Sequence, residues 1–509
     1  MTHTIPPPSR AALWLLTLLQ ASISGASLVV EIVAGRMIAP YVGMSLYTWT
    51  SVIAVVLAGF SVGHWWGGRI AALEKGRALR LTGWTMVGAA LTTGGAAVVL
   101  REVAGPVLAT WANPLSAITI LTALVFFLPS LFAGVPAPVL AVVAMQGRDQ
   151  PERALGAMFA AGAVGAIGGT LLAGFLFISW LGSAATLVVI TAIYVISALL
   201  LFGLSGTAGL KQPKTIASLC AAVGLGAATL MLPSTCDRES QYYCIRTVSM
   251  SDDPANPVRL MVIDHLAHGI SSGQNPQEMY TEHAAMLDAL ARMRMPTSDF
   301  TSFHIGGGSY SVPRAWADRG IGGITVAEID PAVTAQAIAD FWFAPQTARI
   351  IHQDARRTLA EDVRQYDVVI GDAFTDIAVP AHLVTREFFQ LVSDRLSPRG
   401  VFAMNILDNT DRLDALASII VTLRTVFPSV EVWTEARPPV RGERRIFVIL
   451  ASATDSPVSE ISARSPEPRR FAVLEDRFID GFVKRINAQV LTDDYAPIDR
   501  LMGFYPVTN

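Results

Sequence analysis

The stretch FHIGGGSY (Phe303–Tyr310), followed by ITVAEID (Ile324–Asp330) and IIHQDARR (Ile350–Arg357), decides how the second half of this chain folds. An apolar strand runs into three consecutive glycines, and the next apolar strand ends at the acid Glu328. A third short apolar run ends at Asp354. Glycines let the backbone turn tightly and approach a ligand closely, and an acid at the end of the second strand can accept both ribose hydroxyls. The pattern therefore predicts an α/β sheet that binds a nucleoside.

A further buried strand is predicted at YDVVIGD (Tyr366–Asp372), which places Asp372 at its carboxyl end. The sequence from there to Ile406 looks like the fourth and fifth strands of a methyltransferase-type sheet. The glycine loop reads GGGSY rather than GxGxxG, so NAD is not the expected ligand. Because ligands of open α/β sheets bind outside the carboxyl ends of the strands, we expect Glu328, Asp354 and Asp372 to face one crevice.

The region from about Glu239 to Ile406 resembles the spermidine synthase family of polyamine aminopropyltransferases, which bind S-adenosylmethionine or its decarboxylated form. The residues that carry this resemblance are the glycine loop, EIDP (Glu328–Pro331), QDA (Gln353–Ala355), Asp372, VIDHLAHG (Val262–Gly269) and MYTEH (Met279–His283). The resemblance implies a Rossmann-like domain at 301–509, preceded by a small β-rich part at 237–300.

The resemblance also implies roles for particular residues. Glu328 would hold the ribose, Asp354 would hold the adenine, and Asp372 would take the proton from the attacking amine. Tyr280 and Glu282 become catalytic candidates beside Asp372. The implied cofactor-binding residues are Gly306, Gly307, Gly308, Glu328, Asp354, Ala355, Asp264 and His268. Methylthioadenosine is the implied product, and no metal is implied.

Several positions depart from the family pattern. Ser309 stands where the family usually has an acid after the third glycine, and His268 replaces a glutamine that helps to hold the methionine end. Thr375 occupies the second position of the strand-tip acid pair, and Asp376 comes one residue later. The missing acids are those expected to bind a cationic amine. Nucleoside binding is therefore expected to be retained, while polyamine binding is expected to be weakened.

The first half of the chain has a different composition. With 52% hydrophobic and 16% charged residues overall, the chain is too apolar for an ordinary soluble protein, and the excess precedes residue 233. Apolar runs long enough to cross about 30 Å of hydrocarbon occur near 12–34, 48–66, 81–100, 114–145, 156–178, 184–204 and 215–232. They predict a multi-span transmembrane domain at 1–233 with seven helices, or eight if the proline-interrupted run at 114–145 contributes a broken or re-entrant piece.

Two features concern the packing of this bundle. The run AGAVGAIGGTLLAGF (Ala161–Phe175) has small residues at spacings of three and four, which predicts close helix–helix packing. Glu31 and Arg36 lie near the end of the first span, where a charge normally faces protein or water. They could form a structural ion pair with each other or bind a charged substrate.

The combination of the two halves also resembles a known architecture. The chain is similar to fused transmembrane spermidine synthase-like proteins at Glu31–Arg69 and at the ending LTDDYAPIDRL (Leu491–Leu501). The expected fold is thus an α-helical membrane bundle followed by an α/β methyltransferase-like domain with a small N-terminal β-domain. The stretch ATDSPVSEISARSPEPRR (Ala451–Arg470) is expected to be a surface loop.

The topology follows from alternate loops that carry basic residues. Those loops contain Arg69, Lys75, Arg77, Arg80, Arg148, Arg153, Lys211 and Lys214. The positive-inside rule places them and the N-terminus in the cytoplasm of a bacterial-type inner membrane. Seven spans then put the α/β domain on the extracytoplasmic side, which is the favoured placement, whereas eight would put it inside. Cys236 and Cys244 follow the last span as either a disulfide or two thiols.

Composition also limits the partners. A net charge of −3 gives no basic footprint for nucleic acid, and the eight histidines and three cysteines show no metal-ligand spacing. The expected partners are a small-molecule substrate and the lipid bilayer, with a homo-oligomer left open. Four readings of function remain: aminopropyl transfer to an amine, methyl transfer near the membrane, amine-independent cleavage by the substrate's own carboxylate, and a transporter or sensor that only binds a nucleoside.

Overall fold

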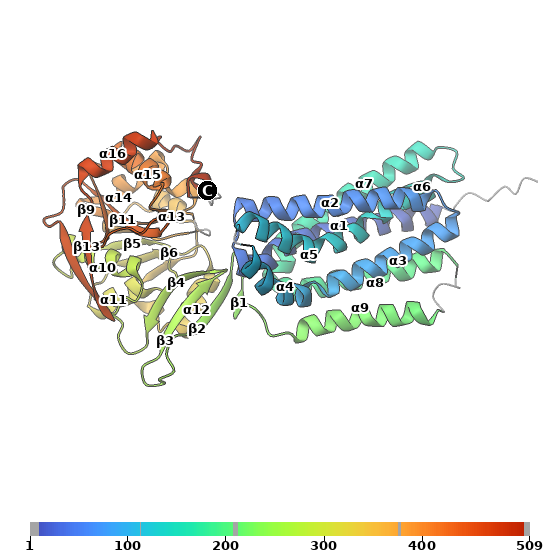
Figure 1. The fold of residues 1–509 in the computed structure, drawn as a ribbon, viewed down its shortest axis with the longest axis horizontal. Coiled ribbons are helices and arrows are strands. Elements are labelled where there is room, and N and C mark those ends of the chain that lie inside the picture. Colours follow the sequence, from blue (N-terminus) through green and yellow to red (C-terminus); the bar gives the residue numbers. More distant parts are fainter. Residues whose placement is uncertain (1–9, 112, 207–211, 375–377, 503–509) are drawn as a thin grey trace, which may run out of the picture. The chain divides into compact units, whose positions relative to one another are not determined.

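The computed structural model describes residues 10–111, 113–206, 212–374 and 378–502. It divides into two compact units. A helical unit comprises Met1–Thr235 together with Glu239–Tyr243, and an α/β unit comprises Cys236–Arg238 together with Cys244–Asn509. Figure 1 shows the elements of each unit.

The helical unit consists of long apolar helices joined by short connections. Their bounds are α1 (Arg10–Val42), α2 (Leu46–Ala71), α3 (Lys75–Gly94), α4 (Ala96–Thr110), α5 (Pro114–Gly134), α6 (Pro136–Met145), α7 (Pro151–Leu172), α8 (Ile178–Leu204) and α9 (Pro213–Met231). Several begin at a proline, whose fixed φ suits the first helical position. Asn113 caps α5, because its side chain accepts hydrogen bonds from the backbone of Leu115 and Ser116.

Small residues bring α1 and α7 into close contact. A Cβ placed on Gly165 would lie 2.1 Å from the carbonyl oxygen of Ala21, and one on Gly169 would lie 2.2 Å from that of Gly25. No other residue type fits at these two positions without moving a backbone. The small-residue spacing in this part of the sequence therefore marks a helix–helix contact, as expected.

The number of candidate membrane helices differs from the expected seven. Five helical stretches of the described chain are long and apolar enough to cross a membrane, and the bent pair α3 and α4 would make six. The difference lies in Pro151–Leu204, which counts once at 54 residues. Gly182 interrupts this stretch with a non-helical backbone (φ 75°, ψ 174°), because glycine tolerates a positive φ. The seven-span prediction is therefore not confirmed by length and composition.

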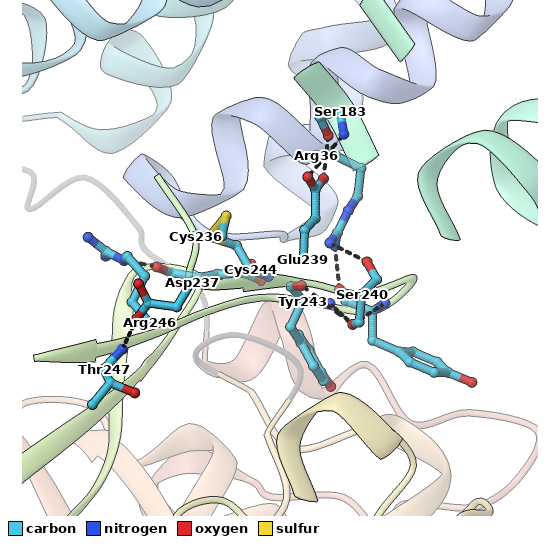
Figure 2. Close-up of a disulfide and its surroundings, with 12 residues drawn as sticks. Arg36, Ser183, Cys236, Asp237, Glu239, Ser240, Tyr243, Cys244, Arg246 and Thr247 are labelled. Atoms are coloured by element: carbon cyan, nitrogen blue, oxygen red, sulfur yellow. Dashed lines mark hydrogen bonds between the residues drawn. A yellow bond between two sulfur atoms is a disulfide. The ribbon is translucent and has the colours of Figure 1, made fainter. Parts of the chain in front are cut away.

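The loop closed by a disulfide corrects the expected ion pair between Glu31 and Arg36. Cys236 and Cys244 form a disulfide, which confirms one of the two alternatives for this pair. Residues 239–243 between them belong to the helical unit, where the buried Arg36 donates to the carbonyl oxygens of Ser240 and Tyr242 (Figure 2). Arg36 thus bonds main-chain carbonyls, and the described residues include no ion pair between it and Glu31. A guanidinium carries five donors, which suits several backbone acceptors at once.

The α/β unit contains two sheets. The smaller one is ordered β1-β2-β3-β4, with β1 (Arg238–Glu239), β2 (Cys244–Ser249), β3 (Val258–Ile263) and β4 (Leu266–Ser272). The larger one is ordered β12-β13-β10-β11-β9-β8-β5-β6-β7. Its strands are β5 (Ser302–Ile305), β6 (Ile324–Ala327), β7 (Arg349–Ile351), β8 (Tyr366–Gly371), β9 (Leu396–Asn409), β10 (Ser429–Glu435), β11 (Arg444–Ser452), β12 (Glu460–Ser465) and β13 (Glu467–Val473).

The helices of the α/β unit lie between these strands in the sequence. They are α10 (Glu282–Arg294), α11 (Ser311–Asp318), α12 (Pro331–Asp340), α13 (Ala355–Glu361), α14 (Arg386–Arg395), α15 (Asp414–Arg424), α16 (Asp476–Ile486) and α17 (Ile498–Met502). Aromatic side chains fill the core beside the sheet. Phe303 of β5 and Tyr366 of β8 are fully buried with ring centroids 5.3 Å apart, and Phe389 of α14 meets Phe402 of β9 at 5.9 Å.

The direction of the strands sets the position of the site. Strands β7, β6, β5, β8 and β9 are parallel, and β11 pairs antiparallel with β9. From β5 the chain proceeds outward to β6 and β7, and then returns to β8 on the other side of β5. The carboxyl ends of β5 and β8 therefore form a topological switch point, where ligands bind in such sheets. This is the methyltransferase-like arrangement that the sequence predicts.

The expected surface loop at 451–470 is wrong in its second half. Residues Glu460–Ser465 and Glu467–Val473 pair as the antiparallel strands β12 and β13, which extend the large sheet beyond β10. Serines and prolines at 456–468 indicate a loop in the sequence, but EISARS also alternates apolar or small residues with polar ones. Pro466 falls at the turn between the two strands, where it costs no ladder hydrogen bond.

Candidate active site at the carboxyl ends of β5 and β8

The glycine loop after β5 has a backbone that other residues would not adopt. Gly306 and Gly308 have φ angles of 89° and 51°. A Cβ on Gly306 would lie 2.6 Å from the carbonyl oxygen of Asp372, and one on Gly307 would lie 2.4 Å from the ring of Tyr310. The three glycines thus let the loop pass directly between the end of β8 and the first turn of α11.

Glu328 follows β6 and is held against this loop. Its two carboxylate oxygens accept hydrogen bonds from the backbone N–H groups of Gly307, at 2.8 Å, and Asp330, at 2.9 Å. Burial raises the pKa of Glu328 to about 7, although these backbone donors favour the charged form. Each oxygen keeps a lone pair for a further donor such as a ribose hydroxyl.

Asp354 follows β7 and begins α13, of which Ala355 is the buried first residue. One carboxylate oxygen accepts from the backbone N–H of Arg357 at 3.0 Å. The other lies 2.7 Å from Nε2 of His382. The hydrogen bond from His382 is the main cause that lowers the pKa of Asp354, and the backbone donors of α13 act in the same direction. Asp354 is therefore both a helix cap and one half of a side-chain pair.

Asp372 follows β8 and lies beside two polar side chains from other elements. Its Oδ1 accepts from Nδ2 of Asn405 at 2.9 Å, and its Oδ2 lies 3.8 Å from Nε2 of His283. Asn405 is in β9, the parallel neighbour of β8, and His283 is in the first turn of α10.

A pocket opens at this point. Its polar lining residues are His268, Thr281, His283, His304, Ser309, Ser311 and Asp372, together with the backbone of Gly306 and Gly307. Asp372 is the one carboxylate among the described residues that line it. Glu328 and Asp354 are absent from this lining, although Glu328 bonds to Gly307, which is part of it. The expectation that all three acids face one crevice is therefore not met by this pocket, because only Asp372 lines it.

Two of the three histidines in the pocket are held neutral. Burial, with His283 and His265 nearby, lowers the pKa of His268 to about 4. Burial alone lowers the pKa of His304 to about 3, and its Nε2 lies 3.2 Å from Oγ of Ser302. At neutral pH neither imidazole adds positive charge to the pocket.

Ser309, which stands where the family has an acid, is committed to a hydroxyl network. Its Oγ lies 2.7 Å from Oγ of Ser311, which in turn lies 3.0 Å from Oγ of Ser271 in β4. A Cβ on Gly269 would lie 2.0 Å from the Ser309 hydroxyl. The position is therefore small, polar and uncharged. Thr375 and Asp376 of the strand-tip motif lie outside the described residues.

Besides Glu328 and Asp354, five predicted site residues do not line the pocket, namely Tyr280, Glu282, Asp264, Gly308 and Ala355. The hydroxyl of Tyr280 donates to Glu278 at 2.9 Å. Glu282 lies 3.9 Å from Arg469, and burial, followed by the charge of Glu435, raises the pKa of its carboxyl. Their catalytic roles stay predictions, and the structure directs Glu282 toward the C-terminal strands.

Asp264 also has a structural contact. Its backbone is left-handed (φ 53°) in the turn between β3 and β4, and its Oδ1 accepts from the backbone N–H of Cys244 at 2.9 Å. The carboxylate thus stabilises the start of β2. A role in cofactor binding stays a prediction for this residue.

Sequence reasoning missed His283, Asn405 and His382. Asn405 is a polar residue in an apolar strand, FAMNI, next to the strand that ends at Asp372. That position is a usable signal, because a buried amide needs a polar partner. His283 and His382 gave no such signal, since the face of a first helical turn and the path of a loop are set by tertiary packing.

Comparison with known proteins gives partial matches, and no family model matches the chain. The chain is 28% identical over 210 residues to the polyamine aminopropyltransferase of Vibrio vulnificus, covering 39% of this chain and 68% of that protein. It is 35% identical over 201 residues to a probable polyamine aminopropyl transferase of Bifidobacterium longum, covering 36% and 44%. It is 31% identical over 172 residues to an N-terminal histidine N-methyltransferase of Emericella nidulans, covering 33% and 30%.

Two of the solved structures that match are described as follows. A probable spermidine synthase from Corynebacterium glutamicum superimposes with a TM-score of 0.44 at 21% identity, covering 55% of this chain and all of that one. A spermidine synthase from Thermotoga maritima gives 0.32 at 18% identity, covering 42% and 74%. The matches span 30 to 68% of the length of these curated relatives. Over part of its length, this chain is thus similar to spermidine synthase-like aminopropyltransferases and to S-adenosylmethionine-dependent methyltransferases.

Proposed function

We propose that this chain is a membrane-integrated, spermidine synthase-like transferase that acts on S-adenosylmethionine or its decarboxylated form. It catalyses the attack of a nucleophile on the propyl carbon next to the sulfonium, which releases methylthioadenosine. The observation that carries the proposal is the glycine loop, whose Gly307 is bonded to the carboxylate of Glu328 and which lines the same pocket as Asp372. In the proposed function, Glu328 holds the nucleoside and Asp372 lies where the nucleophile attacks.

The proposed chemistry needs one orientation and one base. The sulfonium makes its three neighbouring carbons electrophilic, so holding one carbon against the nucleophile selects the product. Glu328 would accept the ribose hydroxyls, and Asp354 would accept from the adenine amino group. A nucleophilic nitrogen forms a bond to the propyl carbon, the carbon–sulfur bond breaks with its electron pair going to sulfur, and the nitrogen's proton passes to a base near Asp372.

The pocket favours an acceptor with less charge than a diamine. Asp372 is the one carboxylate among its described lining residues, and Ser309 supplies a hydroxyl where the family has an acid. Each lost charge-assisted hydrogen bond is worth about 1.5–3 kcal/mol, so a dication would bind far more weakly than in a site with several acids. Turnover without any amine, in which the substrate's own carboxylate attacks, fits the same lining.

Methyl transfer is the second candidate. It is favoured by the 31% identity to an N-terminal histidine N-methyltransferase, which is a different chemistry on a related sequence. The same nucleoside contacts would serve both reactions, because they depend on the ribose and adenine alone. The two differ in which carbon faces the nucleophile, and hence in the nucleoside product.

We also propose that the helical unit is a multi-pass bundle in a bacterial-type inner membrane, with the α/β unit on the extracytoplasmic side. The apolar helices support a membrane location. The Cys236–Cys244 disulfide supports an oxidising compartment, since disulfides persist there and are rare in the cytoplasm. The lipid bilayer is then a partner of the helical unit.

Product identification tests the proposal. The purified full chain is incubated with S-adenosylmethionine or its decarboxylated form, with and without putrescine, and the nucleoside is identified by mass spectrometry. Methylthioadenosine is the expected product, and Asp372→Asn should reduce it strongly if an amine must be deprotonated. S-adenosylhomocysteine would replace the proposal by methyl transfer, and binding without turnover would point to a sensor or transporter.

A further inference from the structure

Asp372 has a histidine neighbour that the departures from the family pattern do not explain. Nε2 of His283 lies 3.8 Å from Oδ2 of Asp372 and 3.4 Å from Oγ1 of Thr281. Its side chain is 14% exposed and lines the same pocket as Asp372. The 3.8 Å separation is longer than a hydrogen bond, so neither atom's hydrogen-bonding capacity is used up by the other.

The opposite side of Asp372 carries an unused acceptor. Asn405 donates its Nδ2 to Asp372 Oδ1, and it is 6% exposed. Within the described residues, Oδ1 of Asn405 has no hydrogen-bond partner. Asn405 is absent from the lining of the pocket, so its hydrogen bond fixes the Asp372 carboxylate in place. Oδ2 of Asp372, on the side of His283, is then the atom that an N–H donor of a nucleophile would meet in the pocket.

His283 is the imidazole of the pocket that lies beside a carboxylate. The titratable groups that face it are Asp372 at the end of β8 and His268 of β4. His268 stays neutral at physiological pH, as does His304. Imidazole is the side chain whose ordinary titration lies closest to neutral pH, which favours it over a carboxylate as a general base.

We propose that His283 is a further catalytic residue of this site: it accepts the proton of an amine that Asp372 holds through an N–H group. The proposal rests on the proposed function. The amine nitrogen bonds to the propyl carbon, the carbon–sulfur pair goes to sulfur, and one N–H proton goes to Nε2 of His283. Asp372 then faces the imidazolium and stabilises it. The acceptor class is an amine that presents one amino group, rather than a diamine gripped at both ends.

The test compares His283→Gln and His283→Ala with His64→Gln, all in the full chain. His64 is a matched control because its ring nitrogen bonds to the carbonyl oxygen of Phe60 in its own helix α2. The rate of methylthioadenosine formation is measured from pH 5 to 9 with a monoamine acceptor, and methylthioadenosine binding is measured by calorimetry as a check on folding. General bases typically contribute about 10²–10⁴-fold, so His283→Gln should lose about that factor in kcat while nucleoside affinity stays unchanged.

The pH profile and chemical rescue separate catalysis from structure. Wild-type and His64→Gln protein should share one pH profile, and His283→Gln should show a different one on the acid side. Added imidazole should restore part of the activity of His283→Ala. A His283→Gln protein with a wild-type rate and pH profile overturns the proposal. Wild-type protein that forms no methylthioadenosine overturns the proposed function and this inference together, whereas normal wild-type turnover without rescue overturns the inference alone.

Discussion

At the scale of single residues, the site is a set of carboxylates that differ in what surrounds them. Glu328 is buried against backbone N–H groups, Asp354 caps α13 and pairs with His382, and Asp372 lies between an amide and an imidazole. The same side-chain chemistry therefore has three expected tasks. In the proposed function, burial suits Glu328 to bind neutral ribose hydroxyls, and its partners place Asp372 where the nucleophile attacks.

The raised pKa of Glu328 makes nucleoside binding depend on pH. Ribose hydroxyls donate to the ionised carboxylate, and a protonated carboxyl has lost one acceptor oxygen. Because the pKa of Glu328 is about 7, methylthioadenosine affinity should be constant above pH 8 and should weaken as the pH falls through 7. Binding at pH 7 should release protons, which calorimetry in buffers of different ionisation enthalpy measures.

Glu328→Ala is the matched variant. It should remove the pH dependence and weaken binding about a hundredfold or more, since two hydrogen bonds to a charged group are lost. The helical unit should stay folded and inserted in the membrane. Unchanged affinity in this variant would remove Glu328 from the binding site.

His382 should compete with the nucleoside for Asp354. Its Nε2 lies 2.7 Å from the Asp354 carboxylate, and its carbonyl oxygen accepts from Arg356 at 3.1 Å. Adenine can use that carboxylate oxygen fully only if the imidazole withdraws. His382→Ala should therefore bind methylthioadenosine about three- to tenfold more tightly, the equivalent of one hydrogen bond. Calorimetry at pH 8 measures this, with His64→Gln as control, and weaker binding in the variant would mean that His382 itself contacts the ligand.

At the scale of elements, the predictable parts were those with a local signal. The glycine loop and the strand-end acids follow from apolar runs and glycines in the sequence, and the methyltransferase-type sheet follows from the resemblance. The hairpin of β12 and β13 does not, because its serines and prolines outweigh a weak alternation. The partners of Asp372 and Asp354 also could not be predicted, since they depend on how α10 and the segment after β8 pack.

The contact of α1 with α7 allows a test inside one helix. Gly165 and Gly168 are close in sequence, but a Cβ on Gly165 would lie 2.1 Å from Ala21, whereas a Cβ on Gly168 would have no atom within 4 Å. Gly165→Ala should destabilise the helical unit by about 1–3 kcal/mol through overpacking. Gly168→Ala should be neutral or slightly stabilising, because alanine favours a helix. Thermal unfolding in lipid nanodiscs measures both, and equal melting temperatures would contradict the close contact.

At the scale of the whole molecule, the proposed substrate is a cytoplasmic metabolite, whereas the disulfide requires an oxidising compartment. The thiols of this disulfide therefore test on which side of the membrane the α/β unit lies. The described residues pair Cys236 with Cys244, and Cys220 of α9 is an exposed free cysteine. An even number of spans would return the α/β unit to the cytoplasm, where this disulfide would be reduced. The candidate membrane helices number five or six in the described chain, one count odd and the other even, and Gly182 interrupts the longest stretch.

We predict that the α/β unit is extracytoplasmic. In a Cys220→Ser background, Cys236 and Cys244 should not react with a membrane-impermeant maleimide on intact spheroplasts until a reductant is added, and should then react without cell lysis. A periplasmic reporter fused after Ser234 should be active, and a cytoplasmic reporter at the same position should be inactive. As a control, Cys244→Ser in the same background leaves only the thiol of Cys236, which should react without reductant. Cytoplasmic reporter activity, with thiols labelled only after lysis, would place the α/β unit inside and require an additional membrane crossing.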